Sequence, residues 1–157
     1  MTTPVVHGST RTTPERRPRA SRSARRFGYV VAVAVNLVML LLIHAWPGWD
    51  VIPFLTDRTT DVLPYVDASI VATILVNTAY VVRDDRATKA SGDLVTNLVS
   101  LVSLMVMWRV WPFDFAGVWG GWEVLVYVLL PVATIGTVIA ALVQLTTVIR
   151  LAAERHH

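Results

Sequence analysis

The sequence predicts an all-α membrane protein with four transmembrane helices in a bundle and a basic N-terminal tail. Hydrophobic residues occupy 54% of the 157 positions and the mean hydropathy is +0.55, which is more than one soluble core of this size can bury. The apolar residues form four long runs. Of the 14 Lys and Arg residues, 12 lie in segments that four crossings would place on one side of a bilayer. Cytoplasmic loops are enriched in these residues, so we expect both termini in the cytoplasm.

Residues 1–26 form a tail rich in Thr, Pro, Ser and Arg, with seven arginines and a single acid, Glu15. Such a segment has too few apolar residues to build a core, and we expect it to be disordered and cytoplasmic. Arginines next to an apolar helix attract anionic lipid, and each contributes about 1 kcal/mol near the surface. The charge therefore indicates contact with a membrane surface and not with nucleic acid.

Four apolar runs predict the spans. In chain order, the predicted spans are 27–46, 66–82, 94–111 and 124–149. A short cytoplasmic tail, 151–157, follows the last span. About 20 apolar residues cross a hydrocarbon core of about 30 Å. The last run exceeds that length, so we expect Pro131 to bend it. The connection 83–92 is short, and the two central spans should form an antiparallel hairpin.

All six tryptophans flank the boundary that this topology places outside the cell. They are Trp46, Trp49, Trp108, Trp111, Trp119 and Trp122. Amphipathic rings prefer the headgroup level of a bilayer, so an anchoring belt accounts for every one of these positions. A binding surface is the alternative interpretation.

Charged residues lie near the predicted span ends. Acids stand at the starts of spans two, three and four, and arginines at the ends of the same spans. These are Asp67, Asp93 and Glu123, then Arg83, Arg109 and Arg150. Each sign complements the helix macrodipole, and several of these side chains can cap free backbone groups.

One acid suggests more than a cap. The second span can begin as early as Thr60, which would put Asp67 more than one turn inside it. His44 and Arg109 lie at a similar predicted depth. Ionisable groups within a membrane are costly unless they are paired, so we expect these three residues to form a polar cluster in the outer leaflet. The cluster would be either a structural ion pair or a site for a proton or ligand.

Neutral polar and small residues mark the faces expected to pack against other helices. Amides hydrogen-bond between helices, and small residues let backbones approach closely. These candidates are Asn77, Asn97, Ser100, Ser103, Gly136, Ala140 and Gln144. Packing within one bundle is favoured over a pore lining, because pore linings carry more charge or more extended polarity.

We predict no catalytic, cofactor-binding or metal-binding residues. Cysteine is absent, which excludes thiolate catalysis and cysteine-ligated metals. His44 is the only histidine within a predicted span, so two matched haem ligands are not expected. A multidrug-type exchanger needs a carboxylate inside the membrane, and we expect none in the interiors of spans one, three and four.

Several segments resemble those of uncharacterised four-pass membrane proteins of actinobacteria. The segments are Trp46-Pro47-Gly48-Trp49, Ile52 to Thr56, Gly92 to Thr96, Trp108 to Phe115, and the run 133–145. The resemblance covers most of 27–150 and implies a location in a bacterial plasma membrane. It transfers no functional residue.

The sequence thus favours a non-enzymatic membrane protein that assembles with itself or with another membrane component. The alternative is a small transporter or channel that works as an oligomer. The expected partners are the bilayer itself, anionic lipid at the tail, and a second copy of the chain or another membrane protein.

Overall fold

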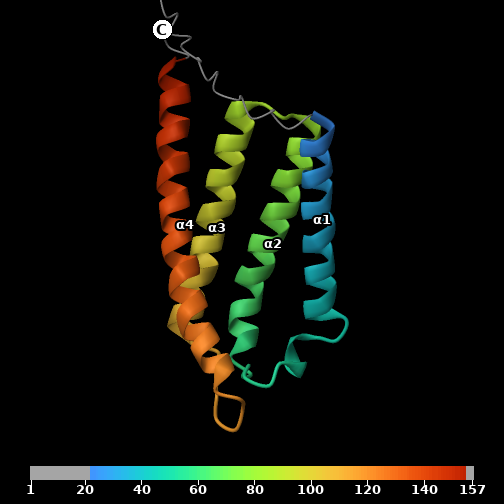
Figure 1. Ribbon diagram of the computed structural model, residues 1–157, viewed down its shortest axis with the longest axis vertical. Coiled ribbons are helices and arrows are strands. Elements are labelled where there is room, and N and C mark those ends of the chain that lie inside the picture. The colour runs from blue at the N-terminus through green and yellow to red at the C-terminus, as the bar shows by residue number, and fades with distance from the viewer. Residues whose placement is uncertain (1–21, 155–157) are drawn as a thin grey trace, which may run out of the picture.

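The computed structural model describes residues 22–154, which form four long helices and no strand (Figure 1). The elements are α1 (Arg22–His44), a short 3-10 helix η1 (Trp49–Val51), α2 (Thr59–Val82), α3 (Arg86–Val110) and α4 (Gly121–Glu154). Each of the four long helices has the length and hydropathy to cross a membrane. The predicted all-helical fold with four apolar helices is therefore confirmed. The disorder predicted for 1–21 lies outside the described residues, and 22–26 belong to α1.

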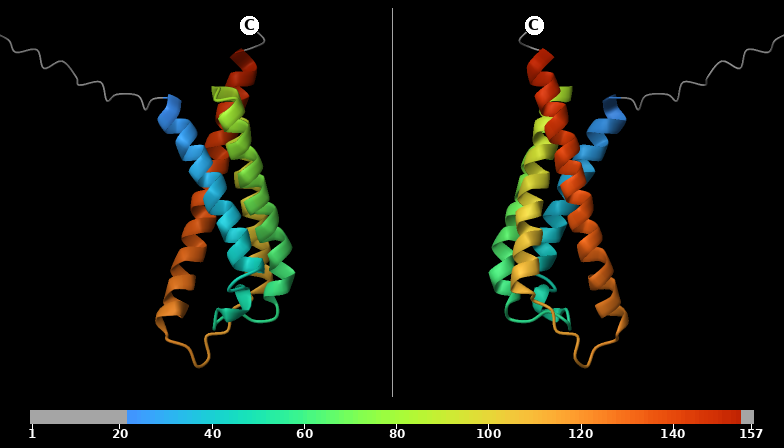
Figure 2. Two further views of the ribbon diagram at one scale, coloured as in Figure 1. Left: turned by 90° about the vertical axis from the view of Figure 1, so that its right-hand side faces the viewer. Right: turned by 90° about the vertical axis from the view of Figure 1, so that its left-hand side faces the viewer.

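The four helices stand in a row in the order α4, α3, α2, α1 (Figure 1). Each contacts its neighbour in sequence, and no other pair of long helices is in contact between residues 22 and 154. Seen from the edge, α1 and α4 incline in opposite directions, so the row is twisted (Figure 2). Both α1 and α4 therefore have one face that no other long helix between residues 22 and 154 covers.

The two ends of the row differ in composition. The start of α1, the α2–α3 connection and the end of α4 lie together (Figure 1). We call this the basic end, and it carries Arg25, Arg26, Arg83, Arg86, Lys89 and Arg150. The opposite end, which we call the aromatic end, carries all six tryptophans. The arrangement of the helices thus keeps most of the cationic residues at one end and the tryptophans at the other, as the sequence predicts.

Every long helix begins before its predicted span. The largest differences are in α2, which begins at Thr59, and in α3, which begins at Arg86. The first turns of α3 are polar, and Asp85 stabilises them as the N-cap by accepting a hydrogen bond from the backbone N–H of Thr88 at 2.8 Å. A search for uncharged runs cannot detect such a start. The connection is thus 83–85 rather than 83–92.

These earlier starts correct the assignment of acids to helix ends. Asp67 and Asp93 each lie about two turns inside their helices, whereas Glu123 is in the first turn of α4 and Arg109 is in the last turn of α3. Arg150 precedes the end of α4 by about one turn. Asp67 and Asp93 therefore lie within their helices and not at the ends, so neither carboxylate caps a helix start.

α4 is continuous through Pro131. Its 34 residues make about 51 Å of helix at about 1.5 Å per residue, which exceeds a hydrocarbon core of about 30 Å. The helix therefore extends beyond the hydrocarbon layer at one or both ends.

The two connections at the aromatic end bind each other. The backbone N–H of Thr56 donates to the carbonyl of Pro112, and the N–H of Asp114 donates to the carbonyl of Phe54, each at 2.9 Å. The Thr56 hydroxyl also donates to Pro112 O at 3.1 Å. Two of the segments that carry the resemblance thus meet in space, and they fasten the α1–α2 connection to the chain that leads into α4.

Aromatic rings reinforce this contact. The Phe54 and Trp122 ring centroids are 5.1 Å apart, and those of Trp111 and Tyr127 are 5.4 Å apart. By contrast, Trp46 is 78% exposed and Trp119 is 77% exposed, as a ring facing headgroups would be. The expected belt is therefore divided between rings that pack within the protein and rings that face outward.

Candidate functional site

His44 and Asp67 come together at the aromatic end of α1 and α2. His44 Nε2 lies 2.9 Å from Asp67 Oδ1 and 3.0 Å from Asp67 Oδ2. The side chains are 48% and 29% exposed, so the pair lies at the surface of the row and not in a closed core. The structure therefore joins two of the three residues predicted to cluster.

Arg109 does not join this pair. Its side chain makes no hydrogen bond or ion pair with any residue of the described chain. The reason is the order of the helices: α2 lies between α1 and α3, and Asp67 points to α1. Ser103 of α3 bonds to α2, and Arg109 follows it by six residues, about 120° further around the helix. The prediction that Arg109 joins this pair, which rested on equal depth alone, is therefore wrong.

A second polar cluster occupies the basic end. Asp84, in the α2–α3 connection, accepts hydrogen bonds from Arg25 Nε at 2.8 Å and from the Tyr29 hydroxyl at 3.1 Å. Lys89 Nζ lies 3.6 Å from the same carboxylate and 5.0 Å from the centre of the Tyr29 ring. The hydrogen bond from Arg25 holds the pKa of Asp84 below its usual value. These contacts tie the start of α1 to the connection and to α3.

Asp93 links three helices. Its Oδ1 accepts a hydrogen bond from the Tyr80 hydroxyl of α2 at 2.7 Å, and its Oδ2 accepts one from Gln144 Nε2 of α4 at 3.3 Å. The Tyr80 hydroxyl also approaches Lys89 O at 2.9 Å, and Tyr80 itself is only 4% exposed. This corrects the expectation that span three has no carboxylate in its interior. Both oxygens have donors, as expected of a structural carboxylate between helices.

Gly92 makes this contact possible. A Cβ atom added at Gly92 would collide with the Tyr80 hydroxyl and would lie 2.7 Å from Val76 Cγ1. The absence of a side chain thus lets α2 and α3 approach closely beside the Asp93 bond. Gly92 and Asp93 belong to one of the segments that carry the resemblance, and their neighbour Tyr80 was not among the predicted residues.

Asp85 completes the basic end. Its carboxylate caps α3 through Thr88 and forms an ion pair with Arg83 at 2.6 Å. The hydrogen bond from the Thr88 backbone is the largest cause that lowers the pKa of Asp85 to about 2. The carboxylate therefore remains ionised at any ordinary pH and holds the start of α3.

The predicted packing residues divide into two groups. Ser103 donates to the Tyr65 carbonyl on α2 at 2.5 Å and Gln144 bonds to α3, so both connect helices. Asn77 instead donates to Thr73 O in its own helix at 2.8 Å. Asn97 and Ser100 make no side-chain hydrogen bond within 22–154.

Gly136 does not pack where we expected. Nothing in the described chain lies within 4 Å of a Cβ built on Gly136. The face of α4 that contacts α3 instead carries Leu130 and Ala141, 7% and 8% exposed, together with Thr134, which accepts a hydrogen bond from Trp108 at 3.0 Å. Gly136 follows Thr134 by two residues, about 200° around the helix, and so faces away from α3.

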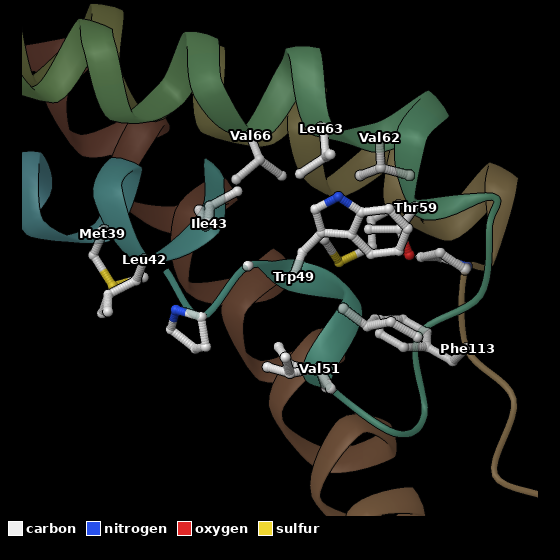
Figure 3. Close-up of a pocket in the computed structure, with 16 residues that line it drawn as sticks. Met39, Leu42, Ile43, Trp49, Val51, Thr59, Val62, Leu63, Val66 and Phe113 are labelled. Atoms are coloured by element: carbon white, nitrogen blue, oxygen red, sulfur yellow. The ribbon is translucent and has the colours of Figure 1, made fainter. Parts of the chain in front are cut away.

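A cavity of about 450 Å³ lies at the aromatic end. It is enclosed by the last turns of α1, the α1–α2 connection, the first turns of α2 and the end of α3 (Figure 3). Its wall contains no charged residue. Two residues of the wall carry a polar side-chain group: Thr59 has a hydroxyl, and Trp49 has an indole N–H. Neither one makes a hydrogen bond to residues of the described chain.

In the described part of the chain, no group of three or more His, Asp or Glu residues is arranged to hold a metal ion. Comparisons with protein-family models, with curated proteins and with solved structures gave no match to this chain.

Proposed function

We propose that this protein is a non-enzymatic assembly component of a bacterial plasma membrane, with its basic end in the cytoplasm. The open edge of α4 is the observation that supports this function. Among the long helices of the described chain, α4 contacts α3 alone, and its uncovered face carries Gly136, beside which the described chain leaves open space. Small residues on a membrane helix allow another helix to approach closely. The partner is a second copy of the chain or another membrane protein.

The sidedness rests on the positive-inside rule, since the cationic residues gather at one end of the row. The chain has no cysteine, so single cysteines can report on topology directly. Ala116→Cys, at the aromatic end, should react with a membrane-impermeant maleimide in intact cells. Arg86→Cys, at the basic end, should react only after permeabilisation. The reverse pattern would invert the proposed orientation.

Capture from native membranes tests the assembly. We expect a stoichiometric membrane partner or a homo-oligomer with the tagged wild type. Gly136→Leu should lose it, because the new side chain fills the open face of α4. Gly28→Leu is the matched control, since that glycine of α1 also has nothing within 4 Å of an added Cβ. A monomer in native membranes, or a homo-oligomer that moves ions or solutes in liposomes, would overturn the proposal.

Asp93 favours a second function, a small proton-coupled transporter. It is a carboxylate about two turns inside α3, and such groups serve proton relays in membrane proteins. Against transport by one chain, the clusters at Asp67 and Asp93 lie toward opposite ends of the row, and Thr73 and Asn77 between them bond to their own helix. Proton-driven solute uptake into liposomes that disappears in Asp93→Asn would establish the second function.

A further inference from the structure

The cavity at the aromatic end has the properties of a site for an apolar ligand. Its volume of about 450 Å³ falls within the range of about 300–1,000 Å³ found for small-molecule pockets. Apolar cavities stay dry and take up apolar molecules, because wall atoms that face a void lack dispersion contacts. A ligand that restores these contacts must be largely hydrocarbon.

The cavity can be reached from outside the row. Met39 of α1 lines it and is 45% exposed, while Val51 and Ile52 of the α1–α2 connection line it and are 56% and 37% exposed. These residues belong to α1 and to the connection that follows it. A ligand can therefore enter from the surrounding bilayer without separating the helices.

Trp49 supplies a hydrogen-bond donor in this wall. Figure 3 shows its indole extending from the connection toward α2, among the side chains that line the cavity. The indole N–H can only donate, and indoles inside proteins normally have an acceptor. No acceptor is provided between residues 22 and 154. The ligand that completes this site is therefore a hydrocarbon with an acceptor oxygen.

Thr59 does not provide a second hydrogen-bonding group for a ligand. Its hydroxyl oxygen has almost no accessible surface, although the residue belongs to the cavity wall. A ligand atom in the cavity cannot reach that oxygen as it stands. Trp49 is thus the polar group that selects among apolar ligands.

We propose that the cavity binds one acyl chain of a membrane phospholipid, with an ester carbonyl of that lipid accepting a hydrogen bond from Trp49 Nε1. The depth agrees with this ligand. Tryptophans of membrane proteins gather at the headgroup level, and the ester groups of a phospholipid lie between its headgroup and its chains. The bilayer also presents this ligand at high local concentration. The site does not depend on assembly through α4.

Native mass spectrometry of the full chain tests the site. The protein is exchanged into mild detergent, mixed with phosphatidylglycerol and scored for bound phospholipid. We expect one phospholipid per wild-type chain and about tenfold less retention in Val66→Phe, because the ring fills the cavity. Val71→Phe is the matched control on the same helix, since Val71 is 42% exposed and does not line the cavity. It should retain lipid like the wild type.

Trp49→Phe tests the hydrogen bond, because it keeps a ring and removes the donor. Retention should fall about fivefold, the factor expected for one ordinary hydrogen bond. Should Val66→Phe fail to fold, Val51→Phe fills the cavity from the connection instead.

Four results would overturn the proposal. Equal retention by the wild type and both cavity-filling variants would show that lipid binds elsewhere, and absence of lipid from every form would show that no such site exists. Bound free fatty acid in place of phospholipid, or unchanged retention by Trp49→Phe, would overturn the assignment of the ester carbonyl.

Discussion

Replacing Thr59 with valine should stabilise the protein. Thr59 is 6% exposed, and its hydroxyl is buried without a hydrogen-bond partner in the part of the chain that the structure describes. A buried polar group left unpaired costs about 1–3 kcal/mol. Valine has nearly the same shape and puts a methyl group in place of the hydroxyl. The free energy of unfolding should therefore rise by about 1–3 kcal/mol.

Thr56→Val is the matched control, because the Thr56 hydroxyl has a hydrogen-bond partner and the Thr59 hydroxyl has none in the described chain. The Thr56 hydroxyl donates to Pro112 O at 3.1 Å, and that carbonyl keeps its second donor, the Thr56 backbone N–H. This variant should lose about 0.5–1.5 kcal/mol, the net value of one hydrogen bond. The two substitutions are chemically identical and are expected to have opposite signs.

Thermal unfolding in detergent micelles measures both. For a chain of this length, 1 kcal/mol moves Tm by about 2–4 °C, so Thr59→Val should unfold at a higher temperature than the wild type and Thr56→Val at a lower one. A Thr59→Val protein that melts below the wild type would refute the reasoning, since it would show that the hydroxyl has a partner. Equal shifts in both variants would mean that the hydrogen bond of Thr56 is not what distinguishes them.

Three other predictions concern the contact between α2 and α3 at Gly92, the hydrogen bond of Ser103, and the cap of α3 at Asp85. Gly92→Ala should lower the free energy of unfolding by about 1–3 kcal/mol through overpacking against Tyr80, whereas Gly28→Ala should not; equal melting of the two would contradict the close approach of α2 and α3. Ser103→Ala should cost about 0.6–1.7 kcal/mol and Ser100→Ala nearly nothing, and the difference in unfolding measures the bond to Tyr65. Asp85 has a pKa lowered from 3.8 to about 2, so its stabilising effect is complete above about pH 4 and disappears as the pH falls toward 2. The difference in Tm between the wild type and Asp85→Ala should shrink over that window, and a constant difference would argue against the cap.

The number and order of the helices could be predicted because a bilayer demands long uncharged runs. The helix starts could not, because polar first turns are held by contacts that hydropathy does not report. In α3 the polar turns contain Arg86, Lys89 and Asp93, and Asp85 caps them. Treating charge as the end of a helix therefore moved Asp93 from the interior of α3 to its boundary. That displacement hid the only carboxylate that joins α2, α3 and α4 in the described chain.

Depth along a helix could be read from the sequence, but direction around it could not. Depth alone placed His44, Asp67 and Arg109 together, and the helix order then separated Arg109 from the others. Gly136 shows the same limit, since it was predicted to pack but has open space beside it in the described chain. The cavity was beyond prediction for another reason. Its wall depends on how the irregular connection 45–58 folds back on α2, and periodicity carries no information about that path.

The way in which α4 is held has a consequence for assembly. Two side-chain hydrogen bonds attach it to α3, one at Thr134 and one at Gln144, which are about 15 Å apart along the helix. Gly136 lies between them in sequence, about 160° around the helix from Thr134 and about 80° from Gln144. An interface that uses the same face of α4 in two copies is isologous and closes as a dimer, whereas contact between α4 of one copy and α1 of the next continues without closure. Loss of assembly in Gly136→Leu alone would indicate the first arrangement or a different partner protein. Loss in Gly28→Leu as well would indicate the second, because only that arrangement uses both edges of the row.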